Sequence, residues 1–335
     1  MEYRVLGKTG LQISALGFGG IPIQRIDAEG SKNLMRKVME AGVNFIDTAR
    51  GYSVSEEYLG YALVGIRDRF VLASKSMARD KESMGRVVDI SLKNLRTDYI
   101  DLYQFHNPNL PQLEQILAPG GAMEALQEAK ASGKIGHIGI TLHSVDLLKQ
   151  VIEYDWVETV MFPYNIVENQ AEELFALCSE KNIGVICMKP LAGGALEDAS
   201  LAMRFVANHP HITVAIPGMA NEEELNLNAA AYADNSPLTT EELERIEALR
   251  KELGTQFCRR CGYCAPCTVG IPIHNIFTAA GYYNRYGLKN WAIFRYESFP
   301  HTASECVGCG ACEERCPYHL PIRQMLKDVE ATFGK

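Results

Sequence analysis

Residues 70–106, FVLASKSMARDKESMGRVVDISLKNLRTDYIDLYQFH, contain the repeating unit that decides the fold of this chain. A short apolar run (70–75) is followed by an amphipathic stretch (83–95) and a second apolar run (100–106), which predicts a strand, a helix and a strand. Two strands joined through a helix pair in parallel, because the chain must cross over before it can pair again. We therefore expect a parallel β-sheet covered by helices.

The same alternation continues through the first 250 residues. The candidate strands are short and apolar, and they are residues 13–18, 43–47, 70–75, 100–106, 135–141, 159–164, 184–189 and 212–216. The candidate helices between them are residues 31–41, 83–95, 123–132, 145–153, 171–181 and 201–208. Eight strands alternating with helices predict an α/β fold, a (β/α)8 TIM barrel. Residues 1–12 are expected to form a small hairpin that closes one end of the barrel.

The alternative is a doubly wound open sheet that binds a dinucleotide. Such sheets carry G-x-G-x-x-G between the first strand and the first helix. Here Gly17, Gly19 and Gly20 are followed by Ile21 and Pro22, so the fingerprint is missing. The sequence favours the closed barrel.

Eight of the ten cysteines lie in two tight runs near the end of the chain. The first run reads C-x2-C-x2-C-x2-C, and its members are Cys258, Cys261, Cys264 and Cys267. The second reads C-x2-C-x2-C-x3-C before a proline, and its members are Cys306, Cys309, Cys312 and Cys316. The second spacing is the bacterial iron-sulfur pattern, in which the fourth cysteine ligates the other cluster.

This pattern predicts two 4Fe-4S clusters with exchanged fourth ligands. Cys316 completes the cluster of the first three cysteines of the first run, and Cys267 completes the cluster of the first three of the second run. Two zinc sites are the alternative, but zinc usually takes two C-x2-C pairs separated by a longer loop. A disulfide framework is less consistent with the chain, which opens MEYRVLGKTG without a signal peptide, and we expect a reducing cytoplasmic location.

The length and charge distribution divide the chain into two unequal parts. At 335 residues it exceeds the usual size of a single core, so we expect a barrel over residues 1–253 and a cluster domain over 254–335. The first part holds 24 Lys and Arg against 35 Asp and Glu, and the second 9 against 6. The sequence has no basic stripe of the kind that binds nucleic acid, so we expect no nucleic-acid partner. No apolar run is long enough to suggest a membrane span.

Polar side chains end three consecutive predicted strands, where barrels carry their chemistry. Asp47, Lys75 and His106 end these strands, and Tyr52 lies five residues after Asp47. Taken singly, a lysine at such a position often pairs with a carboxylate, and a lone histidine is often structural. The order of all four residues on consecutive strands is what indicates a catalytic site.

At these residues the sequence resembles the aldo-keto reductases, and it is most similar to the branch with a ferredoxin-like tail. The resemblance to the barrel covers residues 3 to about 250 and is carried by GFGGIP, NFIDTARGYSVSEEYLGYAL, GHIGITLHS, MKPLAGG and AIPGM. The resemblance of the tail is carried by QFCRRCGYCAPCTVGIPI and CVGCGACEERCPYHLPI, and the long gap between them resembles helical two-cluster ferredoxin domains. It implies hydride exchange between a nicotinamide cofactor and a small carbonyl or alcohol, with electron transfer through two 4Fe-4S clusters to or from a redox partner protein.

The resemblance also implies the role of each polar residue. Tyr52 would protonate the carbonyl oxygen as general acid, and act as base in oxidation. A tyrosine with a pKa of about 10 needs help near neutrality, and the Lys75 ammonium would supply it while Asp47 holds that ammonium in place. His106 would donate a hydrogen bond to the substrate oxygen.

The expected cofactor contacts follow from the same resemblance. They are Thr141, Met188, Lys189, Pro217, Gly218 and Glu224. Thr141 would bind the carboxamide, and Met188 stands where many members have an aromatic ring that stacks on the nicotinamide. NADP-selective members place Lys or Arg after the Pro-Gly turn, whereas this chain has three consecutive glutamates that end at Glu224. We therefore expect NADH over NADPH.

A second hypothesis belongs to another class of protein. The chain would then be an electron-transfer or scaffold subunit whose barrel does not turn over nicotinamide. Met161, Met188 and the acidic loop that ends at Glu224 favour this hypothesis, since Met161 stands where glutamine often binds the carboxamide. The four polar residues at the strand ends favour the enzyme.

Overall fold

The computed structural model describes residues 1–234, 236–254 and 256–334, and the chain forms two compact units. The first comprises Met1–Asn165, Asn169–Leu191 and Asp198–Pro237. The second comprises Ile166–Glu168, Ala192–Glu197 and Leu238–Lys335. Two short segments from the N-terminal part therefore group with the cysteine-rich tail. The domain boundary after residue 253 remains a prediction.

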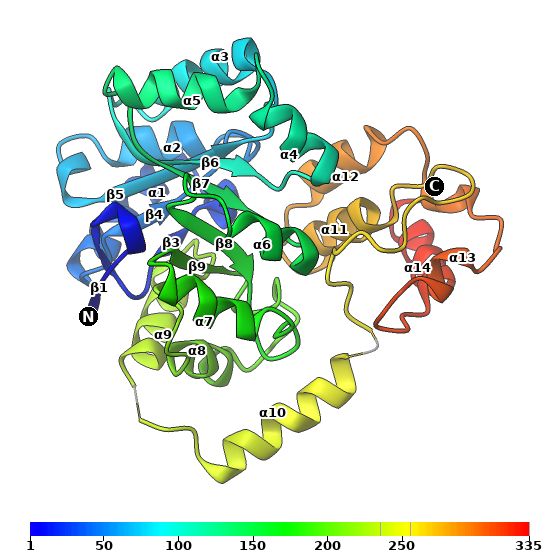
Figure 1. The fold of residues 1–335 in the computed structure, drawn as a ribbon. Helices are drawn as coiled ribbons and strands as arrows, with labels where there is room; N and C mark the ends of the chain where they lie inside the picture. The colour runs from blue at the N-terminus through cyan, green and yellow to red at the C-terminus, as the bar shows by residue number, and fades with distance from the viewer. Residues whose placement is uncertain (235, 255, 335) are drawn as a thin grey trace. The chain divides into compact units, whose positions relative to one another are not determined.

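The first unit contains a parallel eight-stranded sheet whose strands follow one another in chain order (Figure 1). They are β3 (Phe18–Gly19), β4 (Phe45–Asp47), β5 (Val71–Ser76), β6 (Ile100–His106), β7 (Ile135–Thr141), β8 (Thr159–Pro163), β9 (Gly184–Met188) and β10 (Val214–Ile216). The two edges meet, because Leu16 bridges to Ala215 and Gly19 bridges to Gly218 in parallel. The predicted TIM barrel is confirmed.

Helices surround these strands in Figure 1. They are α1 (Ala28–Glu40), α2 (Ser55–Ala62), α3 (Lys81–Asn94), α4 (Leu110–Leu117), α5 (Ala122–Ala131), α6 (Val145–Val151), α7 (Glu172–Glu180), α8 (Ala199–Ala207) and α9 (Glu222–Ala233). Several begin at an Asp, Asn or Ser whose side chain accepts a hydrogen bond from the first turn, as Asp27 does for α1 and Asp80 for α3. These caps fix where each strand-to-helix loop ends.

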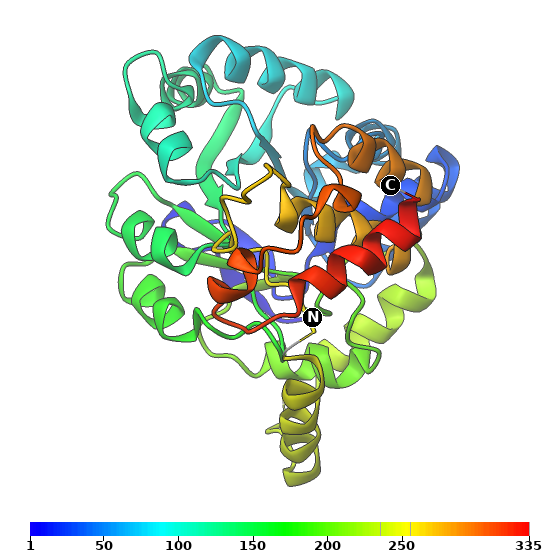
Figure 2. The ribbon, with the colours of Figure 1, turned by 90° about the vertical axis from the view of Figure 1, so that its right-hand side faces the viewer.

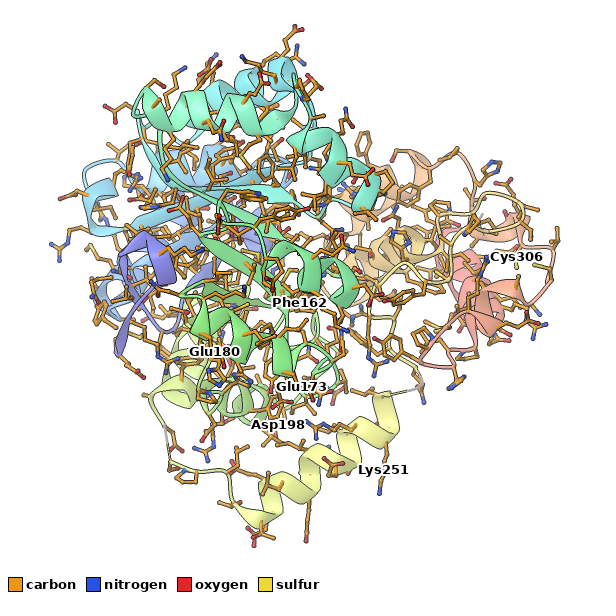
Figure 3. The ribbon with its side chains drawn as sticks, viewed as in Figure 1. Phe162, Glu173, Glu180, Asp198, Lys251 and Cys306 are labelled. Atoms are coloured by element: carbon orange, nitrogen blue, oxygen red, sulfur yellow. The ribbon has the colours of Figure 1, made fainter. Side chains whose placement is uncertain are left out.

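The barrel has an inner and an outer apolar core. The inner core includes Phe45, Leu102 and Met161, whose side chains are buried. The outer core lies between strands and helices: Phe162 of β8, labelled in Figure 3, packs edge-on against Phe175 of α7 at 6.4 Å between ring centroids. Adjacent residues of β8 thus pack into different cores, as the period of a strand requires.

The N-terminal residues form the expected hairpin, but the first predicted strand is wrong. β1 (Tyr3–Val5) pairs antiparallel with β2 (Gln12–Ser14), so the run 13–18 is divided between this hairpin and β3. The turn packs closely on the chain before β9, because a Cβ atom on Gly7 would lie 2.2 Å from the Gly184 nitrogen. Leu6 is fully buried in the inner core, so the hairpin closes that end of the barrel.

The second unit is helical, as expected for its tail. Its helices are α10 (Thr240–Leu253), α11 (Ile273–Asn284), α12 (Lys289–Glu297), α13 (Ala311–Glu314) and α14 (Ile322–Phe333). Tyr296 of α12 stacks on Phe333 of α14 with ring centroids 4.2 Å apart, and Tyr283 of α11 contacts the same ring at 5.3 Å. Figure 2 shows α12 in orange and α14 in red. Within the described ranges, no helix has both the length and the apolar composition of a membrane span.

Glu158, directly before β8, should make the free energy of unfolding of the barrel fall at acidic pH. Its carboxylate accepts hydrogen bonds from Lys130 Nζ at 2.7 Å and from Ile138 N–H at 3.0 Å, and lies 2.6 Å from His137 Nδ1. Burial raises the pKa of Glu158, but hydrogen bonds from His137, Lys130 and Ile138 outweigh it and lower that pKa to about 2. The folded state therefore loses this stabilisation as pH falls from about 4.5, the unfolded value, through about 2.

We expect Glu158→Gln to lower the free energy of unfolding at neutral pH by about 1–3 kcal/mol. The deficit should close as pH falls through that window, which urea unfolding at several pH values would measure. Glu153→Gln removes the exposed partner of Lys181 and should cost less than about 0.5 kcal/mol. A deficit that is the same at pH 2.5 and pH 7 would contradict the assignment.

Candidate active site and cysteine-rich centre

Lys75 and Asp47 form a buried ion pair at the carboxyl ends of neighbouring strands β5 and β4. Lys75 Nζ lies 2.5 Å from Asp47 Oδ2 and donates to the Thr48 carbonyl at 2.8 Å. The two side chains are 2% and 3% exposed. Gln104 Nε2, from β6, donates to the other carboxylate oxygen at 3.3 Å. Both oxygens of Asp47 are thereby bound.

Each charge of this pair depends on the other. Burial raises the pKa of Asp47, and the Lys75 ammonium opposes that rise. Burial likewise lowers the pKa of Lys75, and the Asp47 carboxylate opposes the fall. Removing either side chain would therefore leave a buried charge that the site cannot hold.

The structure brings Tyr52 and His106 beside this pair. The Lys75 ammonium lies 5.0 Å from the centre of the Tyr52 ring. The Tyr52 ring lies edge-on to the His106 ring, with centroids 6.1 Å apart. Both side chains are half-buried, unlike the ion pair. The four residues predicted from the strand ends therefore form one cluster, with Tyr52 and His106 as its more exposed members.

Backbone hydrogen bonds fix the turn that carries Tyr52. Thr48 N–H donates to the Ala73 carbonyl and Arg50 N–H donates to the Lys75 carbonyl, both at 2.9 Å. The fully buried Glu56 at the start of α2 accepts from Ser74 Oγ at 2.8 Å and pairs with Arg50 at 3.2 Å. The segment after β4 is thus attached to β5 through both main chain and side chains.

The predicted carboxamide and stacking residues lie at strand ends of the same barrel. Thr141 ends β7 and is buried, and its Oγ1 accepts from Asn107 N–H at 3.0 Å. Met188 ends β9 and is half-buried. Lys189 has a left-handed backbone (φ 57°), and its Nζ lies 2.9 Å from His143 Nε2. These residues surround the strand ends, where the family resemblance implies the nicotinamide.

The turn at Pro217 and Gly218, expected to contact the cofactor, lies where the barrel closes. The Pro217 carbonyl accepts from Gly19 N–H at 2.9 Å, and a Cβ atom on Gly218 would lie 2.5 Å from Pro22 Cγ. Glu224 is half-buried: Arg25 Nη2 donates to both its oxygens, at 2.9 and 3.0 Å, and Ala220 N–H donates at 2.6 Å. Arg25 therefore compensates the charge of the Glu224 carboxylate.

Sequence reasoning missed several side chains of this region. Gln104 could have been found, since it precedes His106 by two residues and so shares its face of β6. His143 lies two residues beyond β7, and Asn165 donates to the Lys189 carbonyl at 3.0 Å. No local pattern marks Arg25 as the partner of a residue 199 positions away.

The cysteines of the two runs interleave in the second unit. Cys267 lines one pocket together with Cys306, Cys309 and Cys312, which combines the first run with the second. Figure 3 labels Cys306 in this unit. Within the described ranges, no three His, Cys, Asp or Glu side chains converge tightly enough to hold a single metal ion. Four thiols around one pocket fit a larger group with four thiolate ligands, as a 4Fe-4S cluster is.

The other four cysteines of the two runs are Cys258, Cys261, Cys264 and Cys316. Burial is the main cause that raises the pKa of Cys261, and the neighbouring Cys316 contributes in the same direction. Cys264 and Cys316 are both buried in the apolar core of this unit. Arg315, next to Cys316, donates to the carbonyls of Cys264 and Pro266 at 3.0 and 2.6 Å. The end of the second run is therefore attached to the first run.

Comparison with known proteins identifies both parts of the chain. The sequence model described as Aldo/keto reductase family matches residues 15–201. The chain belongs to the aldo-keto reductase family. A model described as 4Fe-4S dicluster domain matches residues 257–321, which contain all eight clustered cysteines. The protein is therefore an aldo-keto reductase-type oxidoreductase with a C-terminal 4Fe-4S dicluster domain.

Several relatives and solved structures are similar to a large part of this aldo-keto reductase. L-galactose dehydrogenase of Arabidopsis thaliana is 27% identical over 303 residues, 74% of this chain and 94% of its own length. NADH-specific methylglyoxal reductase of Escherichia coli is 29% identical and covers 57% of this chain and 68% of its own length. The holo structure of aldo-keto reductase AKR11C1 from Bacillus halodurans is 27% identical, with a TM-score of 0.65 over 74% of this chain and 96% of its own.

The interleaved cysteines predict the metal content of this oxidoreductase. Anaerobically purified protein should contain about eight iron and about eight acid-labile sulfide per chain, since each cubane holds four of each. Cys267→Ala should disturb the cluster of the second run, and Cys316→Ala that of the first, with EPR as the readout. Cys178→Ala, in the barrel, is the matched control and should leave both clusters unchanged. About two zinc per chain without visible absorption would contradict the assignment.

Proposed function

We propose that the barrel exchanges a hydride between a nicotinamide cofactor and a small carbonyl or alcohol, with electron transfer through the two clusters to or from a protein partner. The observation that carries this proposal is the buried Lys75–Asp47 pair with its ammonium 5.0 Å from the Tyr52 ring. Bound nicotinamide would supply or accept the hydride. Thr141, Met188 and Lys189 would hold it at the strand ends, and Pro217, Gly218 and Glu224 would lie beside its ribose.

Tyr52 supplies the proton in this proposal. As the carbonyl carbon gains a hydride, its oxygen becomes an alkoxide that needs a donor within hydrogen-bond reach. The Lys75 ammonium stabilises the Tyr52 phenolate that remains, since a nearby cation favours the charged form of an acid. His106, beside the same ring, donates to the substrate oxygen and fixes its approach. In alcohol oxidation the phenolate takes the proton back.

We expect Tyr52→Phe to lower carbonyl reduction by about a hundredfold or more, the usual scale for a positioned general acid. The measurement is kcat with a panel of small aldehydes and ketones. Iron content and nicotinamide affinity should stay at the wild-type level, because Tyr52 is half-buried and is not a core residue. Tyr58→Phe, on the following helix α2, is the matched control and should retain activity.

Wild-type turnover by Tyr52→Phe on every accepted carbonyl would overturn the proposed mechanism. A chain that binds neither NADH nor NADPH in an anaerobic titration would instead be the electron-transfer or scaffold subunit. Lys75→Met should slow the same step and shift its pH dependence to higher pH, since Tyr52 would lose the cation that favours its phenolate.

We further propose that the cofactor is NADH rather than NADPH. Glu222 and Glu223 are exposed beside the turn, and each would disfavour a 2′-phosphate by a fraction of a kcal/mol up to about 1 kcal/mol. Glu224 adds less than an unpaired carboxylate would, because Arg25 compensates it. The E. coli relative named as NADH-specific supports the same choice.

We expect NADH to bind about tenfold more tightly than NADPH, equivalent to about 1.4 kcal/mol. Glu224→Arg should narrow or reverse this difference, and Arg25→Gln should widen it by uncovering the carboxylate. Dissociation constants measured at low and high salt test the prediction, since screening should shrink the preference. An NADPH preference that is insensitive to salt would show that these glutamates do not lie at the adenosine ribose.

A further inference from the structure

A buried ion pair lies against the first cysteine run. Arg260 follows Cys258 by two residues, and its Nη2 donates to both oxygens of Glu168 at 2.7 and 2.9 Å. The Glu168 side chain is fully buried, and that of Arg260 is 10% exposed. An ion pair at this depth is screened little by solvent, so its charges act strongly on neighbouring groups. The mechanism proposed for the barrel does not use it.

Arg260 also lies near a cluster ligand. Burial raises the pKa of the Cys258 thiol to about 11, and the Arg260 backbone and charge act in the opposite direction. The Arg260 φ of 59° lies in the left-handed region, which non-glycine residues adopt rarely and at a cost of about 1 kcal/mol or more. The side-chain Nε is buried, and within the described ranges it has no hydrogen-bond partner. The Arg260 Nε–H near Cys258 could therefore donate a hydrogen bond to a sulfur of a bound cluster.

The neighbouring Arg259 holds the same two segments together. Its Nε donates to the Val167 carbonyl at 3.1 Å and its Nη1 to the Gly254 carbonyl at 3.0 Å. Its guanidinium lies 3.9 Å from the centre of the Tyr318 ring, two residues after Cys316. The segment 166–168, which follows β8 by only a few residues, is thereby attached to the ligand loop of the first run. Glu168 is fixed in position as a counter-charge.

We propose that Arg260 raises the reduction potential of the cluster held by Cys258, Cys261, Cys264 and Cys316, and that Glu168 limits this rise. Each one-electron reduction adds a negative charge to the cluster, and the fixed Arg260 cation stabilises the reduced form. Glu168 offsets part of the cation by its own charge. Arg260 acts on electron transfer only through the potential of this cluster, and it takes no part in hydride exchange.

The test is an EPR-monitored redox titration of the full-length protein with dithionite as the one-electron reductant. Arg260→Gln should lower the midpoint potential of this cluster and Glu168→Gln should raise it. Each change should alter the ratio of reduced to oxidised cluster at a fixed potential about tenfold, equivalent to about 59 mV. Arg260→Lys keeps the charge and should restore most of the wild-type potential.

Two comparisons separate this effect from damage to the fold. Arg323→Gln removes a half-exposed cation that lines the pocket of the other four cysteines, so it should move the other midpoint and leave this one unchanged. If Arg260→Gln does not fold, Glu168→Gln is compared with the double variant, in which two amides replace the ion pair. The difference between their midpoint potentials then measures the effect of the Arg260 charge. The double variant should have the lower potential.

Opposite signs for the two charge changes, confined to one cluster, would establish the proposal. It would be overturned by shifts of the same sign, by equal shifts of both clusters, or by no shift in variants with full iron content. Steady-state carbonyl reduction by the barrel is measured separately. Its loss would bear on the proposed function and leave this proposal standing.

Discussion

The buried Lys75–Asp47 pair is the interaction on which the candidate active site depends. Neither charge is stable alone at 2–3% exposure, and breaking such a pair typically costs about 3–5 kcal/mol. In the proposed mechanism this pair places a cation 5.0 Å from the centre of the Tyr52 ring, where it favours the phenolate. The register of β4 against β5, the Gln104 contact and the turn held by Arg50 all fix these two side chains. The parallel strands therefore hold the two charged side chains in the fixed positions that the proposed proton transfer requires.

The barrel could be predicted closely wherever strand and helix periods were clear. Residues 100–106 and 135–141 form β6 and β7 with the predicted bounds, because both runs are apolar and have clear ends. The run 13–18 failed for a physical reason: Ser14 pairs in the hairpin, and its N–H donates to the Asn44 side chain, so the apolar pattern continues across two different sheets. Periodicity reports burial and does not report which strand a residue pairs with.

In the second unit, the cysteine spacing predicted the grouping of the thiols but did not predict the helices around them. Fixed spacings of two and three residues indicate which thiols share a group, and Cys267 indeed lines a pocket with three cysteines of the other run. The spacing contains no information on charges brought in from elsewhere. Glu168 and Arg260 are separated by 92 residues, and their pairing depends on tertiary packing that no local pattern encodes.

The Glu168–Arg260 pair also affects where the chain could be cut to study its two parts separately. Segments 166–168 and 192–197 belong by their contacts to the second unit although they follow barrel strands in the sequence. Arg285 donates to the Gly193 carbonyl at 3.0 Å within that unit, just as Arg260 binds Glu168. Ending the chain at residue 253 would remove Arg260 and Arg285, which bind Glu168 and Gly193. The loops after β8 and β9 contain residues of the second unit, so electron transfer and barrel chemistry are best studied in the full chain.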